Sequence, residues 1–399
     1  MARQVSEAYV VASTRVAVGK APRGVYRHTR PDDLLAHVLR SALAQVPSVP
    51  ATRIDDVIVG CAMPEYEQGM NVARIGVLLA GLPDTVPGAT INRFCSSGLN
   101  AVSIAADRIR VGEADIVIAA GTESMSMIPM LGRLAINQKV FAGDETIGIA
   151  YGMGLTAERV ATQWKVSRED QDSFALASHQ KAIAAQKAGE FADETSPYTV
   201  DARDPDLAAG TVRETRRAIT DDEGPRADTS LEVLAKLRPV FAAKGSVTAG
   251  NSSQTSDGAG AAILVSERVL KELALAPLAR FAGFAVAGVP PDVMGVGPIA
   301  AIPKALARAG VRKEDLDWIE LNEAFAAQSL AVIRTLELDA AKINPLGGAI
   351  ALGHPLGATG AIRTATIVHG LRRRKAKWGL VTMCIGTGMG AAGLFESLQ

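Results

Sequence analysis

Short apolar runs alternate along the chain with longer stretches in which apolar residues recur at helical spacing. The runs that we predict to be buried strands are VIVG at 57–60, DIVIAAG at 115–121, AAILVS at 261–266, DWIEL at 317–321, GLVTMC at 379–384 and AAGLFE at 391–396. Predicted helices between them include residues 32–46, 98–111, 298–310 and 358–374. Continuous apolar runs indicate strands that are covered on both faces. The order of elements is therefore typical of an α/β fold.

This order of elements occurs twice. In the first half, the helix at 32–46 is followed by RIDDVIVG, then TIN at 90–92, a helix, DIVIAAG and finally DGAGAAILVS. In the second half, the helix at 298–310 is followed by DLDWIEL, then KIN at 342–344, a helix, GLVTMC and GMGAAGLFES. We therefore predict two similar halves, with an insertion before the last strand of the first. The predicted division is residues 1–121 plus 248–272 for the first half, 122–247 for the inserted domain and 273–399 for the second half.

The inserted segment changes character along its length. Ser167 followed by REDQ predicts a helix start with acidic residues in the first turn, and an alanine-rich helix follows to about residue 188. Residues 201–230, DARDPDLAAGTVRETRRAITDDEGPRADTS, are polar, and this pattern taken alone predicts a solvated, irregular loop. We therefore expect the insertion to combine a long helix with a polar surface segment.

Composition disfavours several classes of protein. Lys+Arg and Asp+Glu balance at 42 each, and aromatic residues make up 4%, so binding to nucleic acid or to an anionic membrane surface is not expected. No run approaches 18 uncharged apolar residues, and we expect no membrane span. The 3 cysteines do not suggest a disulfide scaffold, and neither Cys nor His shows metal-ligand spacing. The absence of an apolar signal core in MARQVSEAYV adds to the expectation of a reducing cytoplasm.

Two cysteines and a histidine lie in glycine-rich backbone. Cys95, in INRFCSSGLNAV, lies where a strand predicted at 88–94 turns into a helix, and the free amides of a helix N-terminus favour a thiolate. His354 holds the matching place in the second half, where a neutral imidazole could take the proton of Cys95. The alternatives stay open: Cys95 as a buried structural cysteine, and His354 as a surface or packing residue.

Two further polar side chains lie at predicted strand ends. Cys384 precedes IGTGMG, and Asn322 lies in ELNEAFAAQ. Ligand sites of open α/β sheets gather at such ends. Asn322 could hold a water or an oxyanion, and it is equally well explained as a turn residue. Cys61 lies in no comparable setting and is predicted to fill the core.

Four blocks of the sequence resemble the signature blocks of the thiolases. In chain order they are NRFCSSGLNAV, LNEAFAAQ, NPLGGAIALGHPLGATGA and VTMCIGTGMGAA. KLRPVF at 236–241 and TAGNSSQTSDGAGA at 248–261 extend the similarity through nearly the whole chain. The resemblance implies a thiolase fold: two duplicated βαβαβαββ halves that form five α/β/α/β/α layers, with a loop domain inserted in the first. It also implies a homodimer, or a tetramer made of two dimers.

The resemblance implies roles for the candidate catalytic residues. Cys95 would be the nucleophile that becomes acylated, and His354 the base that activates it. Cys384 would be the second acid/base, which exchanges a proton with the α-carbon of the acetyl unit. Asn322 would hold a water that forms one oxyanion hole with His354. The backbone amides of Cys95 and Gly386 would form the other hole.

Contacts to CoA are implied in the same way. Ser253 would contact the pantetheine, and Arg226 would lie near the nucleotide end, so the polar stretch around Arg226 would contribute to the CoA groove. We add Met153, Phe241 and Phe325 as further candidate CoA or substrate contacts, although core packing is the favoured role for most of the candidate methionines. CoA is then a co-substrate, and no permanently bound cofactor is expected.

The implied reaction is cleavage of a 3-ketoacyl-CoA by CoA to acetyl-CoA and a shortened acyl-CoA, through an acyl-Cys95 intermediate. Short-chain biosynthetic thiolases commonly carry a histidine just before the Met-Gly that precedes TAE, where this chain has Gly152. Gly152 therefore favours the degradative type, which acts in β-oxidation of fatty acids or related acyl groups. A biosynthetic acetyl-CoA C-acetyltransferase is the alternative. Some degradative thiolases also pair with a hydratase/dehydrogenase subunit, and the sequence leaves that partner open.

Hypotheses from other classes remain. A related condensing enzyme that acts on carrier-protein thioesters would have a second histidine in place of Cys384, so Cys384 in MCIGTG argues against it. The chain could also be a non-catalytic protein that binds acyl chains or lipids, or a redox protein with a Cys95–Cys384 disulfide. Neither would need all four polar side chains, which are Cys95, Asn322, His354 and Cys384. A CoA-dependent thiolysis assay separates these hypotheses from a thiolase.

Overall fold

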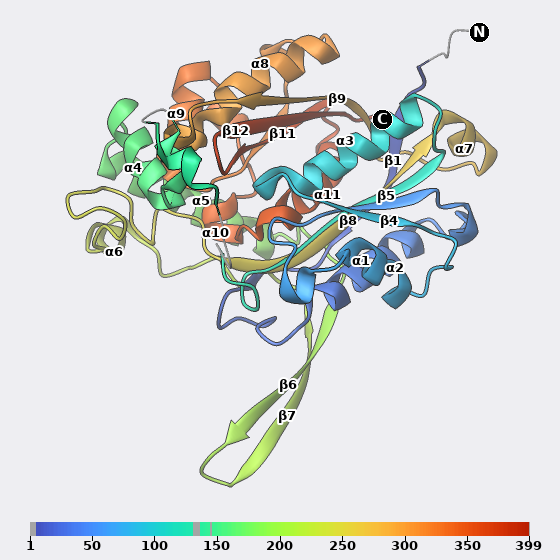
Figure 1. Ribbon diagram of the computed structural model, residues 1–399, viewed down its shortest axis with the longest axis horizontal. Helices are drawn as coiled ribbons and strands as arrows, with labels where there is room; N and C mark the ends of the chain where they lie inside the picture. Colours follow the sequence, from blue (N-terminus) through green and yellow to red (C-terminus); the bar gives the residue numbers. More distant parts are fainter. Residues whose placement is uncertain (1–4, 131–135, 144–145, 399) are drawn as a thin grey trace.

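Two sheets and three layers of helices stack in the order helix, sheet, helix, sheet, helix (Figure 1). The structure is a computed structural model that describes residues 5–130, 136–143 and 146–398. The first sheet has the order β4–β3–β5–β8–β1, and its strands are β1 (Ala8–Arg15), β3 (Asp56–Gly60), β4 (Gly88–Ile91), β5 (Ile116–Ser124) and β8 (Ser256–Ser266). The second has the order β10–β11–β12–β9, and its strands are β9 (Ala279–Gly288), β10 (Trp318–Leu321), β11 (Trp378–Ile385) and β12 (Met389–Glu396).

The two sheets meet edge to edge through the first strand of each half. Tyr9 of β1 pairs with Arg280 of β9, and Val10 pairs with Ala279. The backbone ladder thus runs from one sheet into the other. A short strand, β2 (Gly19–Lys20), adds to β8 at the side.

Helices separate and cover the sheets. The central layer holds α3 (Ser97–Arg110) and α11 (Leu356–Arg374), which pack against each other and between the sheets. The outer layers hold α1 (Pro31–Gln45) and α2 (Val72–Leu79) on the first sheet, and α8 (Gly297–Ala309) and α9 (Ala326–Leu336) on the second (Figure 1). Both faces of each sheet are covered, as the continuous apolar runs predicted. The five-layer α/β fold is therefore confirmed.

The two halves repeat one topology. The first runs β1–α1–β3–α2–β4–α3–β5 and ends with β8. The second runs β9–α8–β10–α9–α11–β11–β12, and its counterpart of β4 is reduced to a single bridge between Ile343 and Ile319. Every strand and helix predicted from the sequence is present within a few residues. The opening strands β1 and β9 were not predicted.

The inserted segment leaves the first sheet after β5 and returns to it at β8. These two strands are antiparallel neighbours, with Ile116 opposite Val265, although most of the insertion separates them in sequence. Between them lie α4 (Met153–Gln163), α5 (Arg168–Lys187), β6 (Tyr198–Asp206), β7 (Thr211–Ile219) and α6 (Leu231–Ala235). The proposed domain boundary at residue 121 falls inside β5, so the three-part division stays a proposal. Helix α5 begins as predicted, because the Ser167 side chain accepts a hydrogen bond from the Asp170 amide at 3.1 Å.

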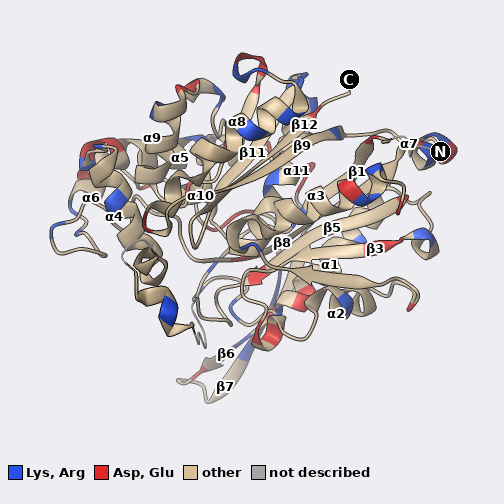
Figure 2. Cartoon of the chain, turned by 45° about the horizontal axis from the view of Figure 1, so that its top comes forward, with Lys and Arg blue, Asp and Glu red and all other residues tan. Residues whose placement is uncertain are grey.

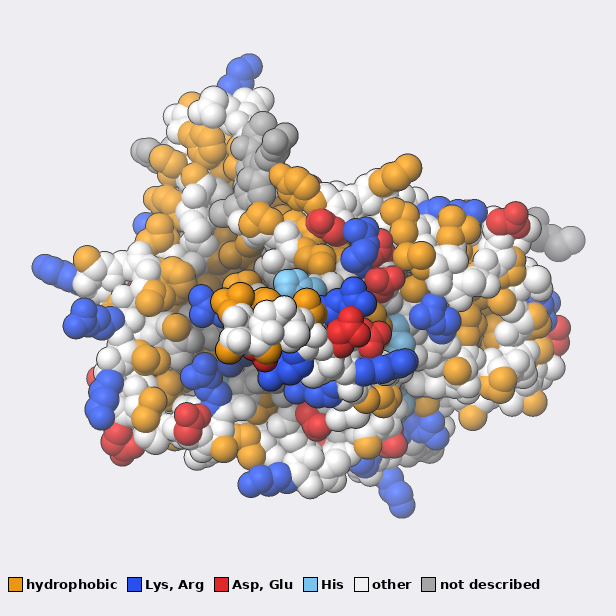
Figure 3. All heavy atoms as spheres, turned by 90° about the horizontal axis from the view of Figure 1, so that it is seen from below, with side chains coloured by type: hydrophobic (Ala, Val, Ile, Leu, Met, Phe, Trp, Pro, Cys, Tyr) orange, Lys and Arg blue, Asp and Glu red, His pale blue; other side chains and the backbone are white. Residues whose placement is uncertain are grey.

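The prediction of an irregular loop at 201–230 is wrong for its first part. Residues 198–219 form an antiparallel hairpin, β6–β7, that projects from the body of the molecule (Figure 1). Its charges pair across the strands, with Arg203 2.9 Å from Glu214 and Arg216 3.6 Å from Asp201. Figure 3 views the molecule from the side on which the hairpin projects, and basic and acidic side chains are interspersed there. A ribbon that is exposed on both faces has no apolar alternation, so its sequence was misinterpreted as a loop.

Short helices complete the described part of the chain. The α-helical turns are α7 (Glu267–Glu272) and α10 (Ala349–Leu352). The 3-10 helices are η1 (Ala51–Arg53), η2 (Tyr66–Gln68), η3 (Phe94–Ser96), η4 (Gln138–Phe141), η5 (Ile147–Ala150), η6 (Pro291–Val296), η7 (Lys313–Asp315) and η8 (Ala340–Lys342). Among the described residues, no helix combines the length and the apolar character needed to span a membrane. Basic and acidic residues are interspersed in the described part of the chain (Figure 2).

A buried ion-pair cluster ties the insertion to the first sheet. Arg15 of β1 is 2% exposed, and its guanidinium bonds to Glu194 at 2.6 Å and to Asp222 at 2.7 Å. Arg15→Met would leave two buried carboxylates without their cation, which typically costs about 3–5 kcal/mol. We expect a clearly lower urea midpoint, measured by circular dichroism. The matched control is Arg203→Met, which removes an exposed pair and should change the midpoint little. Equal midpoints for the two variants would refute the anchoring role of Arg15.

Candidate active site

Three chain segments with candidate catalytic residues meet at one end of the central layer. The η3 turn that carries Cys95 packs against α11, which begins two residues after His354, and against β11, which carries Cys384. The approach is close because glycines line it. A Cβ on Gly98 would lie 2.6 Å from the Ala361 amide nitrogen. Helices α3 and α11 can therefore cross only with glycine at this position.

The turn before α3 presents Cys95. Asn92 accepts a hydrogen bond from the Phe94 amide at 2.8 Å, and the Ser97 hydroxyl accepts one from the Arg93 amide at 2.8 Å. Phe94 is held at φ 43°, a left-handed angle that costs energy in a non-glycine residue and persists where the surroundings fix it. Cys95 thus lies at the strand-to-helix turn, as its sequence setting predicted.

The Cys95 sulfur is a thiol at rest. Burial raises the pKa of Cys95 to about 11, although the N–H groups of Gly386 and of Cys95 itself lower it. The backbone amides therefore favour the thiolate in the expected direction, but desolvation of the sulfur outweighs their effect on its pKa. A base is needed to activate Cys95. Two backbone N–H groups, those of Gly386 and Cys95, thus point at the sulfur.

His354 is held as a neutral imidazole with one defined tautomer. Burial, followed by the positive charge of Arg363, lowers the pKa of His354 to about 3. The Asn322 side-chain amide donates to His354 Nε2 at 3.3 Å, so Nε2 carries the lone pair. The proton is then on Nδ1, which donates to the Thr359 hydroxyl at 2.6 Å. The ring is fixed by its backbone as well, because the His354 amide donates to Ser256 Oγ at 3.0 Å.

Asn322 lies at the end of β10 with part of its side chain unpaired. It is 2% exposed, and its backbone amide donates to the Thr382 carbonyl at 2.9 Å. Its side-chain oxygen has no hydrogen-bond partner among the described residues. A buried polar atom of this kind typically binds a water or a ligand. Asn322 and His354 therefore form a bonded polar pair, beside which the Asn322 side-chain oxygen is free to accept a hydrogen bond from a water or a ligand.

Cys384 ends β11 and is fully buried. Burial raises the pKa of the Cys384 thiol, and a charge on Cys95 raises it further. Cys384 therefore stays protonated while Cys95 carries charge, and its thiol holds a proton that can be transferred. All three cysteines of the chain are free thiols.

The apolar candidates form a wall beside Cys384. Met153 and Phe325 pack in one cluster with Cys384, and Phe241 meets Phe325 edge to face at 6.0 Å between ring centroids. A Cβ on Gly386 would lie 3.7 Å from the Met153 sulfur, so glycine leaves this space open. Phe241 is 40% exposed, so it lies where this apolar wall meets solvent. The structure thus brings Met153, Phe241 and Phe325 together beside the polar residues.

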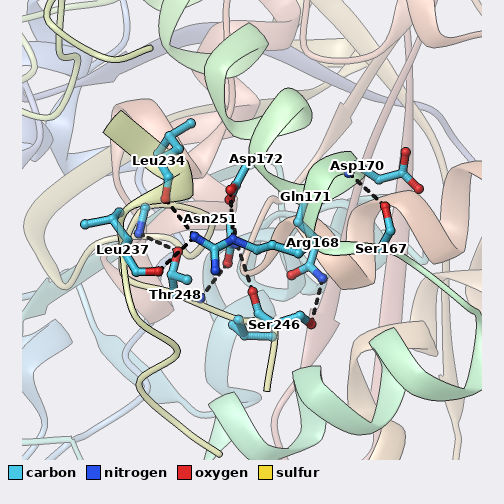
Figure 4. Close-up of polar contacts among 12 residues, drawn as sticks. Ser167, Arg168, Asp170, Gln171, Asp172, Leu234, Leu237, Ser246, Thr248 and Asn251 are labelled. Atoms are coloured by element: carbon cyan, nitrogen blue, oxygen red, sulfur yellow. Dashed lines mark hydrogen bonds and ion pairs between the residues drawn. The ribbon is translucent and has the colours of Figure 1, made fainter. Parts of the chain in front are cut away.

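Ser253 lies on a segment that the inserted helix α5 holds in place. The Ser253 amide donates to the Ala324 carbonyl at 2.9 Å, which fixes it beside Phe325. Figure 4 shows Asp172 of α5 pointing toward Asn251, whose side-chain amide donates to it at 3.0 Å. Arg168, also on α5, pairs with Asp172 at 2.7 Å and bonds the carbonyls of Leu234 and Leu237 (Figure 4). The segment before Ser253 is therefore clamped to the insertion.

Arg226 lies apart from the catalytic side chains. It is exposed, and its backbone amide donates to His179 Nδ1 on α5 at 3.2 Å. Burial, then the charges of Arg226 and Lys20, lowers the pKa of His179 to about 4. The charges of Arg226 and Lys20 thus lie close together beside His179 of α5. This arrangement suits an anionic group such as a phosphate.

Several residues that shape the site were not predicted. Thr359 and Ser256 hold His354, and Glu323 with Ser178 hold the segment before it. Thr359 follows His354 by five positions inside the glycine-rich block GHPLGATGA. Its place in that block was the sequence signal from which its role could have been predicted. Ser178 comes from a distant helix, and no sequence pattern links it to Glu323.

A buried carboxylate lies behind Cys95. Glu123 accepts hydrogen bonds from the amides of Ala62 at 2.7 Å and Gly357 at 2.9 Å, and from the Gln68 side chain at 2.6 Å. Cys61 is buried as predicted, with its thiol 3.8 Å from Glu123. Among residues 5–130, 136–143 and 146–398, no group of three or more Cys, His, Asp or Glu side chains is placed to hold a metal ion.

Two family models cover almost the whole chain. The one described as "Thiolase, N-terminal domain" matches residues 8–268, and "Thiolase, C-terminal domain" matches residues 275–397. A Bacillus subtilis protein named 3-ketoacyl-CoA thiolase is 48% identical, covering 98% of this chain and 100% of its own length. The human peroxisomal 3-ketoacyl-CoA thiolase is 45% identical, covering 98% and 91%.

Solved structures give the same result for the fold. A Bacillus anthracis acetyl-CoA acetyltransferase superposes with a TM-score of 0.89 at 38% identity, covering 100% of both chains. The human mitochondrial 3-ketoacyl-CoA thiolase superposes with a TM-score of 0.88 at 39% identity, covering 98% of this chain and 99% of its own.

Proposed function

The chain belongs to the thiolase family, and from this we propose that it cleaves a 3-ketoacyl-CoA with CoA to give acetyl-CoA and a shortened acyl-CoA. Relatives named 3-ketoacyl-CoA thiolase, 45–48% identical over nearly the full chain, support the degradative reaction. One geometric observation carries the proposal. The Asn322–His354 pair, the amide-supported Cys95 thiol and the Cys384 thiol come from four segments that meet at one place, namely the end of β10, the turn before α11, η3 and β11.

The first half-reaction breaks a carbon–carbon bond. His354 Nε2 takes the proton of Cys95, and the thiolate attacks the keto carbon of the substrate. Charge develops on the keto oxygen and is stabilised by fixed donors. The bond between the α-carbon and the former keto carbon then breaks, and its electron pair forms the enolate of acetyl-CoA. Cys384 gives its proton to that α-carbon, and the shortened acyl group stays on Cys95.

The second half-reaction returns the enzyme to its resting state. A proton passes from His354 to the Cys384 thiolate, and acetyl-CoA leaves. His354 then takes the proton of an incoming CoA thiol, whose thiolate attacks the acyl group. Cys95 departs as a thiolate and recovers its proton from His354. Each proton is thus accounted for by three side chains, without a permanently bound cofactor or a metal.

CoA is proposed to lie between the insertion and the second half. The apolar wall of Met153, Phe241 and Phe325 supports contact with pantetheine or acyl chain, and Ser253 lies beside it. Arg226 supports a contact at the nucleotide end, since its charge lies beside that of Lys20. The exposed edge of the wall at Phe241 supports entry of the ligand from solvent.

Chain-length preference tests the degradative assignment. A Cβ on Gly152 would meet nothing within 4 Å, so the place of the short-chain enzymes' histidine is open space here. Each methylene buried against the apolar wall contributes up to about 0.8 kcal/mol, or about fourfold in kcat/KM. We expect thiolysis to persist or rise from acetoacetyl-CoA to longer 3-ketoacyl-CoA substrates, measured by chromatography of the acyl-CoA products. A steep fall beyond acetoacetyl-CoA would instead favour the biosynthetic acetyltransferase, the activity named for the Bacillus anthracis structure.

A homodimer, or a tetramer of two dimers, is part of the same proposal. Strand β4 is the edge of the first sheet, and a hollow of about 430 Å³ runs along it between Gln68 and Asn92. Met70 beside it is 95% exposed. An open sheet edge with exposed apolar groups supports pairing with a second copy. A hydratase/dehydrogenase subunit is a further proposed partner, and the free thiols support a reducing, cytoplasmic location.

A further inference from the structure

Asn322 is followed by a buried glutamate whose contacts are all hydrogen-bond donors. Glu323 is 2% exposed, and its carboxylate accepts from the Ser178 hydroxyl at 2.7 Å, the Asn344 side-chain amide at 2.7 Å and the Ile350 amide at 3.2 Å. Burial raises the pKa of Glu323, and the bonds from Ser178 and Asn344 oppose that shift. Donors on both oxygens fit a carboxylate and leave no acceptor for a carboxylic proton.

Ser178 links this carboxylate to the segment that leads to His354. Its hydroxyl donates to Glu323 and accepts from the Gly348 amide at 3.1 Å. A Cβ on Gly348 would lie 2.1 Å from the Glu323 carboxyl carbon, so the carboxylate lies directly against the backbone there. Ser178 is on α5, in the inserted segment. The insertion therefore reaches the backbone just before the catalytic histidine.

Asn344 fixes the other side of the same segment. Its side chain accepts from the Leu321 amide at 2.9 Å and donates to the Leu321 carbonyl at 2.8 Å, as a neighbouring strand would. Leu321 and Glu323 are thus both held, and Asn322 lies between them. These bonds determine where Asn322 meets His354.

We propose that Glu323 and Ser178 are positioning residues, which hold Asn322 and the segment leading to His354 so that α5 of the insertion supports the chemistry through them. The inference rests on the proposed thiolase reaction. A displacement of about 1 Å between reacting groups can cost about 10²-fold in rate. Loss of the Ser178 hydroxyl removes one hydrogen-bond donor from the Glu323 carboxylate and the acceptor of the Gly348 amide. The carboxylate and the backbone at Gly348 are then no longer joined through Ser178.

The test compares Ser178→Ala and Glu323→Gln with Ser173→Ala, which removes an exposed serine hydroxyl from the same helix. We expect kcat for thiolysis to fall about 10- to 100-fold in the first two variants, while KM for CoA changes less than about threefold. Ser173→Ala should behave as the wild type. Glu323→Gln places an amide donor next to the donors that now bind the carboxylate, and this can destabilise the fold. If that variant fails to fold, Ser178→Ala alone provides the test.

A double-mutant cycle separates positioning from a general loss of stability. In an Asn322→Ala background, Ser178→Ala should lower kcat by clearly less than it does in the wild type, because one of the two groups that it positions is already gone. Retention of the full effect in that background, or a Ser178→Ala enzyme that matches Ser173→Ala, would overturn the inference. Absence of thiolysis in the wild type would refute the proposed function instead, so the two failures are distinguishable.

Discussion

Replacement of Cys95 by alanine should abolish thiolysis, with a loss of about 10⁴-fold or more in kcat. The reason is chemical: the acyl group has no other nucleophile to hold it. Cys384 is fully buried, and burial raises the pKa of its thiol, so it cannot substitute. The measurement is the CoA-dependent loss of 3-ketoacyl-CoA. Cys61→Ala is the matched control, because it removes a buried free cysteine that has no proposed part in the chemistry, and it should retain activity within severalfold.

Normal thiolysis by the Cys95→Ala protein would contradict the assignment of the nucleophile. A loss of the same size in Cys61→Ala would also contradict it, because cysteine removal alone would then explain the effect. Thermal unfolding of each variant is the control for folding, and we expect a cooperative transition for both. The comparison thus separates the chemistry of one sulfur from the packing of another.

Replacement of Cys384 by alanine should separate the two half-reactions. Carbon–carbon cleavage needs a proton for the enolate, so thiolysis is expected to fall about 10²–10⁴-fold, as for loss of a matched general acid. Acyl exchange between acetyl-CoA and labelled CoA needs only Cys95 and His354, because no carbon–carbon bond changes. We expect that exchange to continue within about tenfold of the wild-type rate, measured by incorporation of label into acetyl-CoA.

The pattern across the two assays decides the role of Cys384. Equal losses in thiolysis and in exchange would show that Cys384 supports Cys95 or the packing of the site rather than the enolate. Cys384 is fully buried, so a small loss of exchange from the cavity left by the sulfur is expected in either case. Only a large difference between the assays fits a dedicated proton donor.

Much of the fold could be predicted because its buried strands are continuous apolar runs. The duplication is visible for the same reason, since TIN and KIN, and the glycine-rich last strands, recur in the same order. Strand β9 escaped prediction because ARFAGFAVAG is rich in Gly and Ala, which have low β-propensity, and its strand form depends on pairing with β12. The hairpin β6–β7 escaped because cross-strand charge pairs, not an apolar face, hold it together.

The candidate site was predictable where its residues sit in glycine-rich blocks. Cys95, His354 and Cys384 each lie beside glycines that permit close approach of backbone, and this local pattern is visible in sequence. The protonation state of Cys95 was not visible in the sequence. The desolvation that raises its pKa depends on packing against α11 and β11, which are distant in sequence. The Ser178–Glu323 bond joins residues 145 positions apart, and only the fold brings them together.

A covalent acyl group on Cys95 is tested most directly by incubating the enzyme with 3-ketohexanoyl-CoA in the absence of free CoA. We predict release of acetyl-CoA in an amount equal to the enzyme active sites, and a butyryl group on the peptide that contains Cys95, detected by mass spectrometry. Later addition of CoA should remove that group and release butyryl-CoA. Acetyl-CoA release that requires free CoA, with no acylated Cys95 peptide at any time, would contradict the mechanism.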